Sequence, residues 1–248
     1  MCQANEYINL FGSTIIKQVN FEIAVGSNYF FEIAKIQAFR ILWKTISNSY
    51  GIPINNVHII AIPTNRNKTI YDYNNNLIRS TSECMAAILG GANSVKNFNY
   101  DSIYKNRNEF SKRIAINQLL ILKHESHIDK VKNPISGSYY ISYLVDEFSK
   151  KSFKLFKELD SKSGFLDHLK NGVIQRKVKE NASKEQTNYN SKLEILVGAN
   201  CYANMDEKMK LQLEINPFPS KESKKTLIEP LIKKRLAAES EKTRIGNE

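Results

Sequence analysis

The chain has 248 residues, of which 42% are hydrophobic and 10% aromatic, so it can bury a core as one large domain or two small ones. Its three cysteines, Cys2, Cys84 and Cys201, lie far apart and suggest neither a disulfide framework nor a cysteine zinc site, which indicates a reducing cytoplasm. No apolar run approaches the roughly 20 residues that span a bilayer. The formal charge of +11 is compatible with anionic partners, but the scattered lysines predict solvated helix faces.

The first elements expected in chain order are a strand and a long helix. Phe21–Val25 is a short apolar run that predicts a strand, and Gly26 and Ser27 form a candidate cap for the helix that follows. This helix is expected to end at Gly51. Its apolar residues recur at helical spacing: Phe30, Phe31, Ala34, Ala38, Ile41, Leu42 and Ile46.

A second strand and helix follow. Val57–Ile62 is a continuous apolar run between two asparagines and Pro63, which is typical of a buried strand. The next helix is predicted from about Tyr73 to Leu89, with the glycines at positions 90 and 91 as its stop signal. Ser94–Phe98 is then expected to form a short strand.

Helices are predicted to dominate the rest of the chain. A third helix with an apolar face precedes the turn at Asn133 and Pro134, and a fourth ends before Gly164. Lys170–Ser191 is predicted to be a charged helical stretch, whereas Ser220–Arg244 is predicted to be a surface helix or tail. The apolar faces of the third and fourth helices contain Phe110, Ile114, Leu119, Ile121, Leu122, Tyr140, Leu144, Phe148, Leu155, Phe156 and Leu159.

The alternation of strands and helices predicts an α/β fold with parallel strands joined by crossover helices. A complete (β/α)8 barrel needs eight strands in about 250 residues, and only three or four can be placed here. We therefore expect about half of a TIM-type barrel, its C-terminal half, in residues 21–202. An N-terminal segment, 1–20, would precede it, and a helical, charged extension, 203–248, would follow. The outer strands would present unpaired backbone groups that a second chain or a covering segment must satisfy.

Four segments in this order resemble the cobalamin-dependent acyl-CoA mutases. One is the helix Tyr29-Phe-Phe-Glu-Ile-Ala-Lys35, which continues to Arg40-Ile-Leu-Trp43; another is the loop Asn67-Lys-Thr-Ile-Tyr-Asp72. The helix Arg79–Gly91 and the stretch Phe110–Tyr140, with its Arg-Ile-Ala-x-Asn-Gln-Leu-Leu pattern, complete the set. The similarity is greatest to the small, non-catalytic subunit of methylmalonyl-CoA mutase, covers about Phe21–Tyr202, and implies a chain truncated at both ends relative to that subunit.

The resemblance implies a cobalamin enzyme, yet the cofactor motif of that family is missing. In such mutases a loop with the pattern Asp-x-His-x-x-Gly supplies the lower ligand of cobalt. The four histidines here, His58, His124, His127 and His168, all lack an aspartate two positions earlier. Adenosylcobalamin is therefore expected on a partner subunit and not on this chain.

The positions that meet the substrate in the catalytic subunit are also altered. Alignment through the Phe-Phe-Glu-Ile-Ala-Lys helix places Gln18 and Asn20 where an arginine and a serine meet coenzyme A, and His58, Ile60 and Ile62 where the family has Arg-x-His-x-Gln. Isoleucine can neither stabilise charge on a thioester carbonyl nor donate a hydrogen bond to it. We accordingly assign no catalytic, cofactor-binding or metal-binding residue to this chain.

Three local patterns can each be interpreted as a ligand-binding site or as an ordinary structural feature. His124 and His127 would share one side of a helix, as a metal pair requires, but no third ligand is evident and a capped or solvated pair is favoured. Gly90 and its neighbour could cradle a phosphate, although a helix stop explains both glycines. Ser138, after Gly137, could present backbone N–H groups to an anion, but an ordinary N-cap is preferred.

The leading hypothesis is therefore a structural partner of the large catalytic subunit of an adenosylcobalamin-dependent isomerase that interconverts methylmalonyl-CoA and succinyl-CoA. Together they would form a cytoplasmic heterodimer whose acyl-CoA binds through the complex. Two alternatives stay open: a basic, non-enzymatic binding protein for nucleic acid or CoA-like anions, and the remnant of a split mutase gene.

Overall fold

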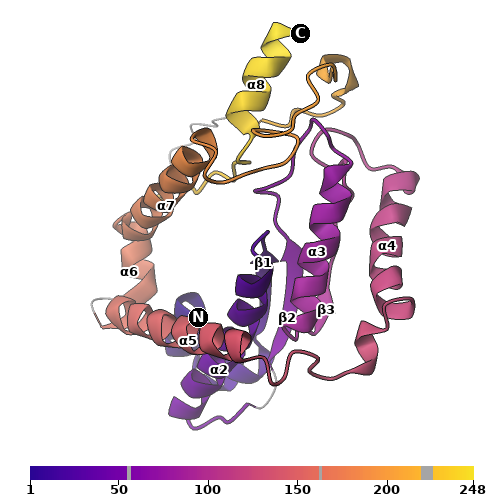
Figure 1. The fold of residues 1–248 in the computed structure, drawn as a ribbon. Coiled ribbons are helices and arrows are strands. Elements are labelled where there is room, and N and C mark those ends of the chain that lie inside the picture. Colours follow the sequence, from indigo (N-terminus) through magenta and orange to yellow (C-terminus); the bar gives the residue numbers. More distant parts are fainter. Residues whose placement is uncertain (55–56, 162–163, 219–225) are drawn as a thin grey trace.

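The computed structural model describes residues 1–54, 57–161, 164–218 and 226–248, and it has an α/β fold with a three-stranded sheet (Figure 1). The strands are β1 (Asn20–Val25), β2 (His58–Pro63) and β3 (Ser94–Val95), and they are parallel in the order β1-β2-β3. The α/β prediction is confirmed. Because three strands do not close a barrel, the half-barrel interpretation stays a prediction.

Two helices connect the strands and cover one face of the sheet. Helix α2 (Tyr29–Ser49) links β1 to β2, and α3 (Asn75–Leu89) links β2 to β3. Both carry apolar residues at helical spacing, and their buried sides pack in one cluster with the inward-facing strand residues. That cluster forms the main core and includes Val25, Ile33, Ala34, Ile36, Trp43, Ile59, Ala61, Ala86 and Ala87.

The predicted cap of the first long helix and the predicted length of the third strand both differ from the structure. The predicted cap at Ser27 is wrong, since the side chain of Asn28 accepts the N–H of Phe31 at 3.3 Å. The predicted strand to Phe98 is also wrong in length. The reason is that Asn97 turns toward the next helix, where its amide nitrogen donates to Gln118 Oε1 at 2.9 Å.

A helix at the start of the chain was not predicted from the sequence. Helix α1 (Cys2–Phe11) is followed by a 3-10 turn (Ser13–Gln18), and it buries Ala4, Asn5 and Ile8. Its Asn5 amide nitrogen donates to Asp160 Oδ1 at 2.8 Å. The N-terminal segment therefore packs onto the molecule through a contact that joins residues 155 positions apart.

The remaining helices follow the predicted order. Helix α4 (Glu109–His124) lies beside α3, and α5 (Tyr139–Asp160) packs against α2. Helices α6 (Gly164–Lys170) and α7 (Val173–Asn190) continue from α5 along the side of the molecule away from α3 and α4 (Figure 1). In the part of the chain that the structure describes, no helix is both long and apolar enough to cross a membrane.

The prediction of a surface helix or tail over Ser220–Arg244 is confirmed for the helix from Ala238 onward, but it did not foresee the burial that begins at Arg235. Residues 219–225, which include the predicted start, lie outside the described part. Helix α8 spans Ala238–Asn247, and Arg235 and Glu241 are buried together with Leu236 and the two alanines that follow. This segment packs against the rest of the protein because it contains apolar residues and an ion pair that are both buried.

Burial makes a prediction about the cysteines. Cys84 on α3 is fully buried, and this burial raises the pKa of its thiol to about 12, whereas Cys2 and Cys201 are half-buried. Because the thiolate is the reactive form, we expect Cys84 to be alkylated about a hundredfold or more slowly than Cys201 in the native protein. Mass spectrometry after timed iodoacetamide treatment measures this. Equal rates for the two cysteines would contradict it.

Candidate functional site

A cavity with a volume of about 730 Å³ opens at the carboxyl ends of β1 and β2. Ser27 lines it just after β1, Thr64 just after β2 and Arg79 on α3, whereas Glu185 on α7 and Leu236 form its far side. Loops at the carboxyl ends of parallel strands are the usual place for a ligand site, since connecting segments there are free to carry polar side chains. The cavity is therefore the candidate site.

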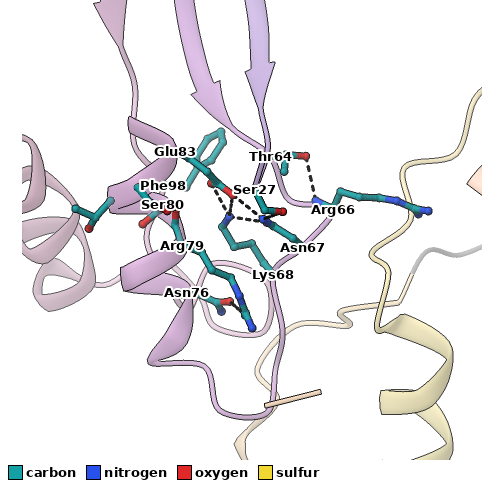
Figure 2. A network of polar contacts seen from close by, with 12 residues as sticks. Ser27, Thr64, Arg66, Asn67, Lys68, Asn76, Arg79, Ser80, Glu83 and Phe98 are labelled. Atoms are coloured by element: carbon teal, nitrogen blue, oxygen red, sulfur yellow. Dashed lines mark hydrogen bonds and ion pairs between the residues drawn. The ribbon is translucent and has the colours of Figure 1, made fainter. Parts of the chain in front are cut away.

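A buried polar network lies beside this cavity and shares Ser27 and Asn67 with its lining (Figure 2). Lys68 Nζ donates to Glu83 Oε2 at 2.7 Å and to Asn67 Oδ1 at 2.7 Å. The Asn67 amide nitrogen donates in turn to Glu83 Oε1 at 2.6 Å and to Ser27 Oγ at 3.2 Å. The network thus connects α3, the loop after β2 and the start of α2 through side chains that use one another as partners.

Burial dominates the electrostatics of this pair. The side chain of Lys68 is 8% exposed and that of Glu83 is 1% exposed. Desolvation lowers the pKa of Lys68 and raises the pKa of Glu83, and each partner's charge opposes that effect. The two charges are held by each other and by an amide, so neither is positioned to exchange a proton with a ligand.

Two arginines that line the cavity also have their guanidinium groups bound to other protein side chains. Arg79 donates to Thr69 Oγ1 and to Asn76 Oδ1, both at 2.9 Å, and burial lowers its pKa. Arg66 forms a salt bridge with Glu185 at 2.6 Å. The Arg66–Glu185 salt bridge links the loop after β2 to α7. The bond from Arg79 to Thr69 links α3 to the same loop.

The resemblance-derived substrate positions lie mainly on the sheet, away from this network. Asn20 on β1 is paired in register with His58 on β2, and Ile60 and Ile62 follow on the same face. His58 is exposed and its Nε2 lies 3.1 Å from Ser94 Oγ. Gln18 precedes the strand, at the end of the 3-10 turn. The structure thus brings Asn20, His58 and the two isoleucines together on one face of the sheet. His58 is the one ionisable side chain among these four.

The two histidines considered as a metal pair do not share a helix face. Helix α4 ends at His124, and His127 lies beyond it with a left-handed backbone at φ 50°. The geometric premise of the pair was therefore wrong, because the helix stops one turn too early. Among the residues that the structure describes, no group of three or more histidine, cysteine or acidic side chains could hold a metal ion.

The structural interpretations of the two glycine motifs, as a helix stop and as a helix N-cap, are confirmed. Gly90 is the C-cap of α3, and Gly91 follows with φ 86°, as a helix stop requires. Ser138 is the N-cap of α5, where its hydroxyl accepts the N–H of Ile141 at 3.5 Å. Both motifs are explained by local helix termini.

The sequence did not predict the cavity-lining residues Asn67 and Leu236 or the buried charges beside them. Asn67-Lys-Thr was interpreted as part of a family motif, and Arg235 as part of a surface helix or tail. A local signal existed for Glu83, since it lies on the buried side of α3 next to the small residues Cys84 and Ala87. A carboxylate on such a face requires a buried cation. No comparable signal marked Lys68 as that cation, because it lies in a loop.

Gly198, next to the cavity-lining Val197, gives a further prediction. Gly198 has φ 79°, and an added Cβ would lie 2.5 Å from the Cβ of Asp72. We expect Gly198→Ala to lower the unfolding free energy by about 2 to 4 kcal/mol, through backbone strain plus this clash. Gly172→Ala is the matched control, since Gly172 also has positive φ but no atom within 4 Å of an added Cβ. Equal losses in urea unfolding would show that the contact with Asp72 is unimportant.

These features define an α/β protein with parallel strands, crossover helices and a cavity at the carboxyl edge of its sheet. The family model for methylmalonyl-CoA mutase matches residues 8–244, a longer stretch than the Phe21–Tyr202 similarity predicted from motifs. The chain belongs to the methylmalonyl-CoA mutase family.

Individual relatives agree with this assignment. The chain is 35% identical to the methylmalonyl-CoA mutase small subunit of Porphyromonas gingivalis over 94% of its own length and 38% of that protein's length. It is 32% identical to the large subunit of the same organism and 31% identical to the mutase of Rhizobium meliloti, each over 75% of this chain and 26% of the relative. The chain thus spans well under half the length of the relatives it matches.

Proposed function

We propose that this chain is a non-catalytic component of a methylmalonyl-CoA mutase, equivalent to part of a small subunit. It would act in the cytoplasm as the structural partner of a large catalytic subunit that interconverts methylmalonyl-CoA and succinyl-CoA. The similarity to the small subunit of Porphyromonas gingivalis supports this role, as does the existence of a large subunit in that organism. Within the chain we propose a mutase-type domain over residues 21–202, preceded by segment 1–20 and followed by extension 203–248.

The observation that carries the proposal is the chemistry of the sheet face. Where the resemblance places a cation, an imidazole and an amide, this chain has His58, Ile60 and Ile62 on one face. A thioester carbonyl would meet aliphatic side chains there, so hydrogen bonding and charge stabilisation would be absent at the reacting centre. The buried ion pair beside the cavity, Lys68 and Glu83, is occupied by its internal contacts.

The residues present do not fit a histidine-ligated cobalamin. Of the four histidines, none lines the cavity: His58 is at the start of β2, His124 ends α4, His127 lies beyond that helix, and His168 is in α6. Adenosylcobalamin would bind the large subunit, and the radical chemistry would belong to that subunit.

Co-expression with the large mutase subunit of the same organism tests the role directly. We expect the two chains to purify together as a heterodimer, and we expect the present chain alone, given adenosylcobalamin and methylmalonyl-CoA, to form no succinyl-CoA. Turnover by the isolated chain would refute a non-catalytic role. A stable monomer that does not bind the large subunit would refute the role of partner.

The alternative of a nucleic-acid-binding protein has a separate signature. Its basis is the net charge of +11. In the structure the exposed lysines of α5 at positions 150 and 151 pair with Glu147, and Lys157 lies over the ring of Phe153. Binding to RNA or DNA whose affinity falls steeply with salt would favour that alternative over a mutase role.

A further inference from the structure

The cavity at the carboxyl ends of β1 and β2 has no role in the proposed function. Its volume of about 730 Å³ lies within the range of small-molecule sites, which is about 300 to 1,000 Å³. Its lining comes from segments far apart in the sequence: the ends of the two strands, α2, α3, α7, residues 194–197 and Leu236. Such a lining can enclose a small molecule from several sides.

Aliphatic side chains line much of this cavity, and several of them are exposed. Ile78 on α3 is 72% exposed, and Ile195 and Val197 are about half exposed. Arg79 donates to the carbonyl of Val197 at 2.5 Å, so the loop that contains Val197 lies against the start of α3, beside Ile78. Because exposed aliphatic surface gains free energy when it is removed from water, this part of the cavity favours an apolar ligand.

The charged groups of the lining balance one another. Lys35 forms an ion pair with Glu32, and Arg66 forms one with Glu185 at 2.6 Å. The formal charge of the lining is zero, although the whole chain carries +11. Its three cations and three carboxylates are Lys35, Arg66, Arg79, Glu32, Glu185 and Glu194.

This pairing of charges disfavours an anionic ligand. An anion that bound Lys35 or Arg66 would have to displace the carboxylate that each already holds. Arg79 is held by Thr69, Asn76 and the carbonyl of Val197. A charge that enters a partly enclosed site without a partner is poorly solvated there, whereas an uncharged ligand disturbs none of these contacts.

Uncharged polar side chains complete the lining. The side chain of Asn28 accepts the N–H of Phe31 through its oxygen, and Thr64 Oγ1 accepts the N–H of Arg66 at 3.2 Å. Both side chains therefore use their acceptor oxygens within the protein, while their N–H and O–H groups can donate to a ligand. A few neutral donors of this kind orient a bound molecule without requiring it to be charged.

We propose that this cavity is a binding site for an uncharged, mainly apolar small molecule that carries at least one hydrogen-bonding group. The aliphatic side chains around Ile78 contact its apolar part, and the neutral polar side chains contact its hydrogen-bonding group. The site goes beyond the proposed function, because the role of a non-catalytic subunit assigns no ligand to this chain.

Two fluorescent probes that differ by one charged group test the inference. N-phenylnaphthylamine is uncharged, and anilinonaphthalene sulfonate is the same aromatic amine with an added sulfonate. In titrations of the full chain we expect saturable binding of the neutral probe, with a Kd about tenfold or more below that of the sulfonate. A basic protein that bound dyes only through its charge would prefer the sulfonate. Tighter binding of the sulfonate, or no binding of the neutral probe, would overturn the inference.

A pair of variants places the neutral probe in the cavity. Ile78→Gln removes aliphatic surface from the lining, and we expect it to weaken binding of the neutral probe about tenfold. Leu155→Gln is the matched control, since Leu155 on α5 is 56% exposed and does not line the cavity, and its Kd should stay within about twofold of the native value. Both replaced side chains are exposed, so the fold should be retained. Equal affinities of the two variants would assign the probe to another surface and refute the site.

A second pair of variants tests the selectivity for uncharged ligands. Glu185→Gln leaves the guanidinium of Arg66 without its carboxylate, so we expect the preference for the neutral probe over the sulfonate to fall about tenfold. Glu180→Gln is the control on the same helix, because Glu180 pairs with Lys177 at the surface and does not line the cavity. An unchanged preference in Glu185→Gln would refute the assignment of selectivity to paired charges. These titrations leave the subunit role to be decided by co-expression alone.

Discussion

Replacing Lys68 by methionine is expected to lower the unfolding free energy by about 3 to 5 kcal/mol. The substitution leaves the Glu83 carboxylate, whose side chain is 1% exposed, without its cation. Removing one partner of a buried ion pair is strongly destabilising because the other charge remains in a medium that solvates it poorly. Urea unfolding followed by circular dichroism measures the change.

A second replacement provides the control. The double variant Lys68→Met with Glu83→Leu removes both charges, and we expect it to be at least about 2 kcal/mol more stable than Lys68→Met. If the double variant were no more stable than the single one, the loss would come from packing and not from the uncompensated carboxylate.

The pH dependence of Lys68→Met has a definite sign. Desolvation raises the pKa of Glu83, and the ammonium that opposes this effect is absent in the variant. A carboxyl group whose folded pKa lies above its unfolded value binds more protons in the native state. Stability is therefore lost as the pH rises between those two values, by up to about 1.4 kcal/mol per pH unit. Greater stability of the variant at pH 8 than at pH 5 would contradict this reasoning.

Replacing Glu241 by alanine is expected to release the C-terminal segment. Glu241 pairs with Arg235, and its Oε1 accepts the N–H of Ile70 at 2.9 Å. Arg235 Nη1 also donates to the carbonyl of Lys68 at 3.2 Å, and the N–H of Leu236 donates to Arg66 O at 2.8 Å. The change leaves the buried guanidinium of Arg235 without its carboxylate and the buried N–H of Ile70 without an acceptor. We therefore expect the unfolding free energy to fall by about 3 to 5 kcal/mol.

Limited proteolysis shows whether this loss is local. We expect cleavage in the segment from Arg235 onward to accelerate in Glu241→Ala before the rest of the chain unfolds. The control is Glu239→Gln on the same helix, because Glu239 is exposed and pairs with Lys234 at the surface, and its stability should change by at most about 0.5 kcal/mol. Equal proteolysis of the two variants would show that the buried pair does not anchor the segment.

The sequence by itself determined the local elements and the family. Apolar runs and helical spacing predicted β1, β2 and the helices that follow them, because burial of one face imposes a period on neighbouring residues. The glycines after α3 and the serine before α5 were correctly interpreted as helix termini, since capping depends on residues within one turn. The family motifs were equally local, and the family match confirmed them.

Only the tertiary structure decided which polar groups are buried together. Lys68 meets Glu83 across 15 positions, and Ile70 meets Glu241 across 171. Such pairs have no periodic signature, so the C-terminal segment was predicted as a surface helix or tail and its burial was not foreseen. The open edge of β1 was expected only in general terms, because its identity depends on strand order. Strand order and buried charge pairs are properties of the packed chain, and the free energy that selects them arises from contacts between segments far apart in sequence.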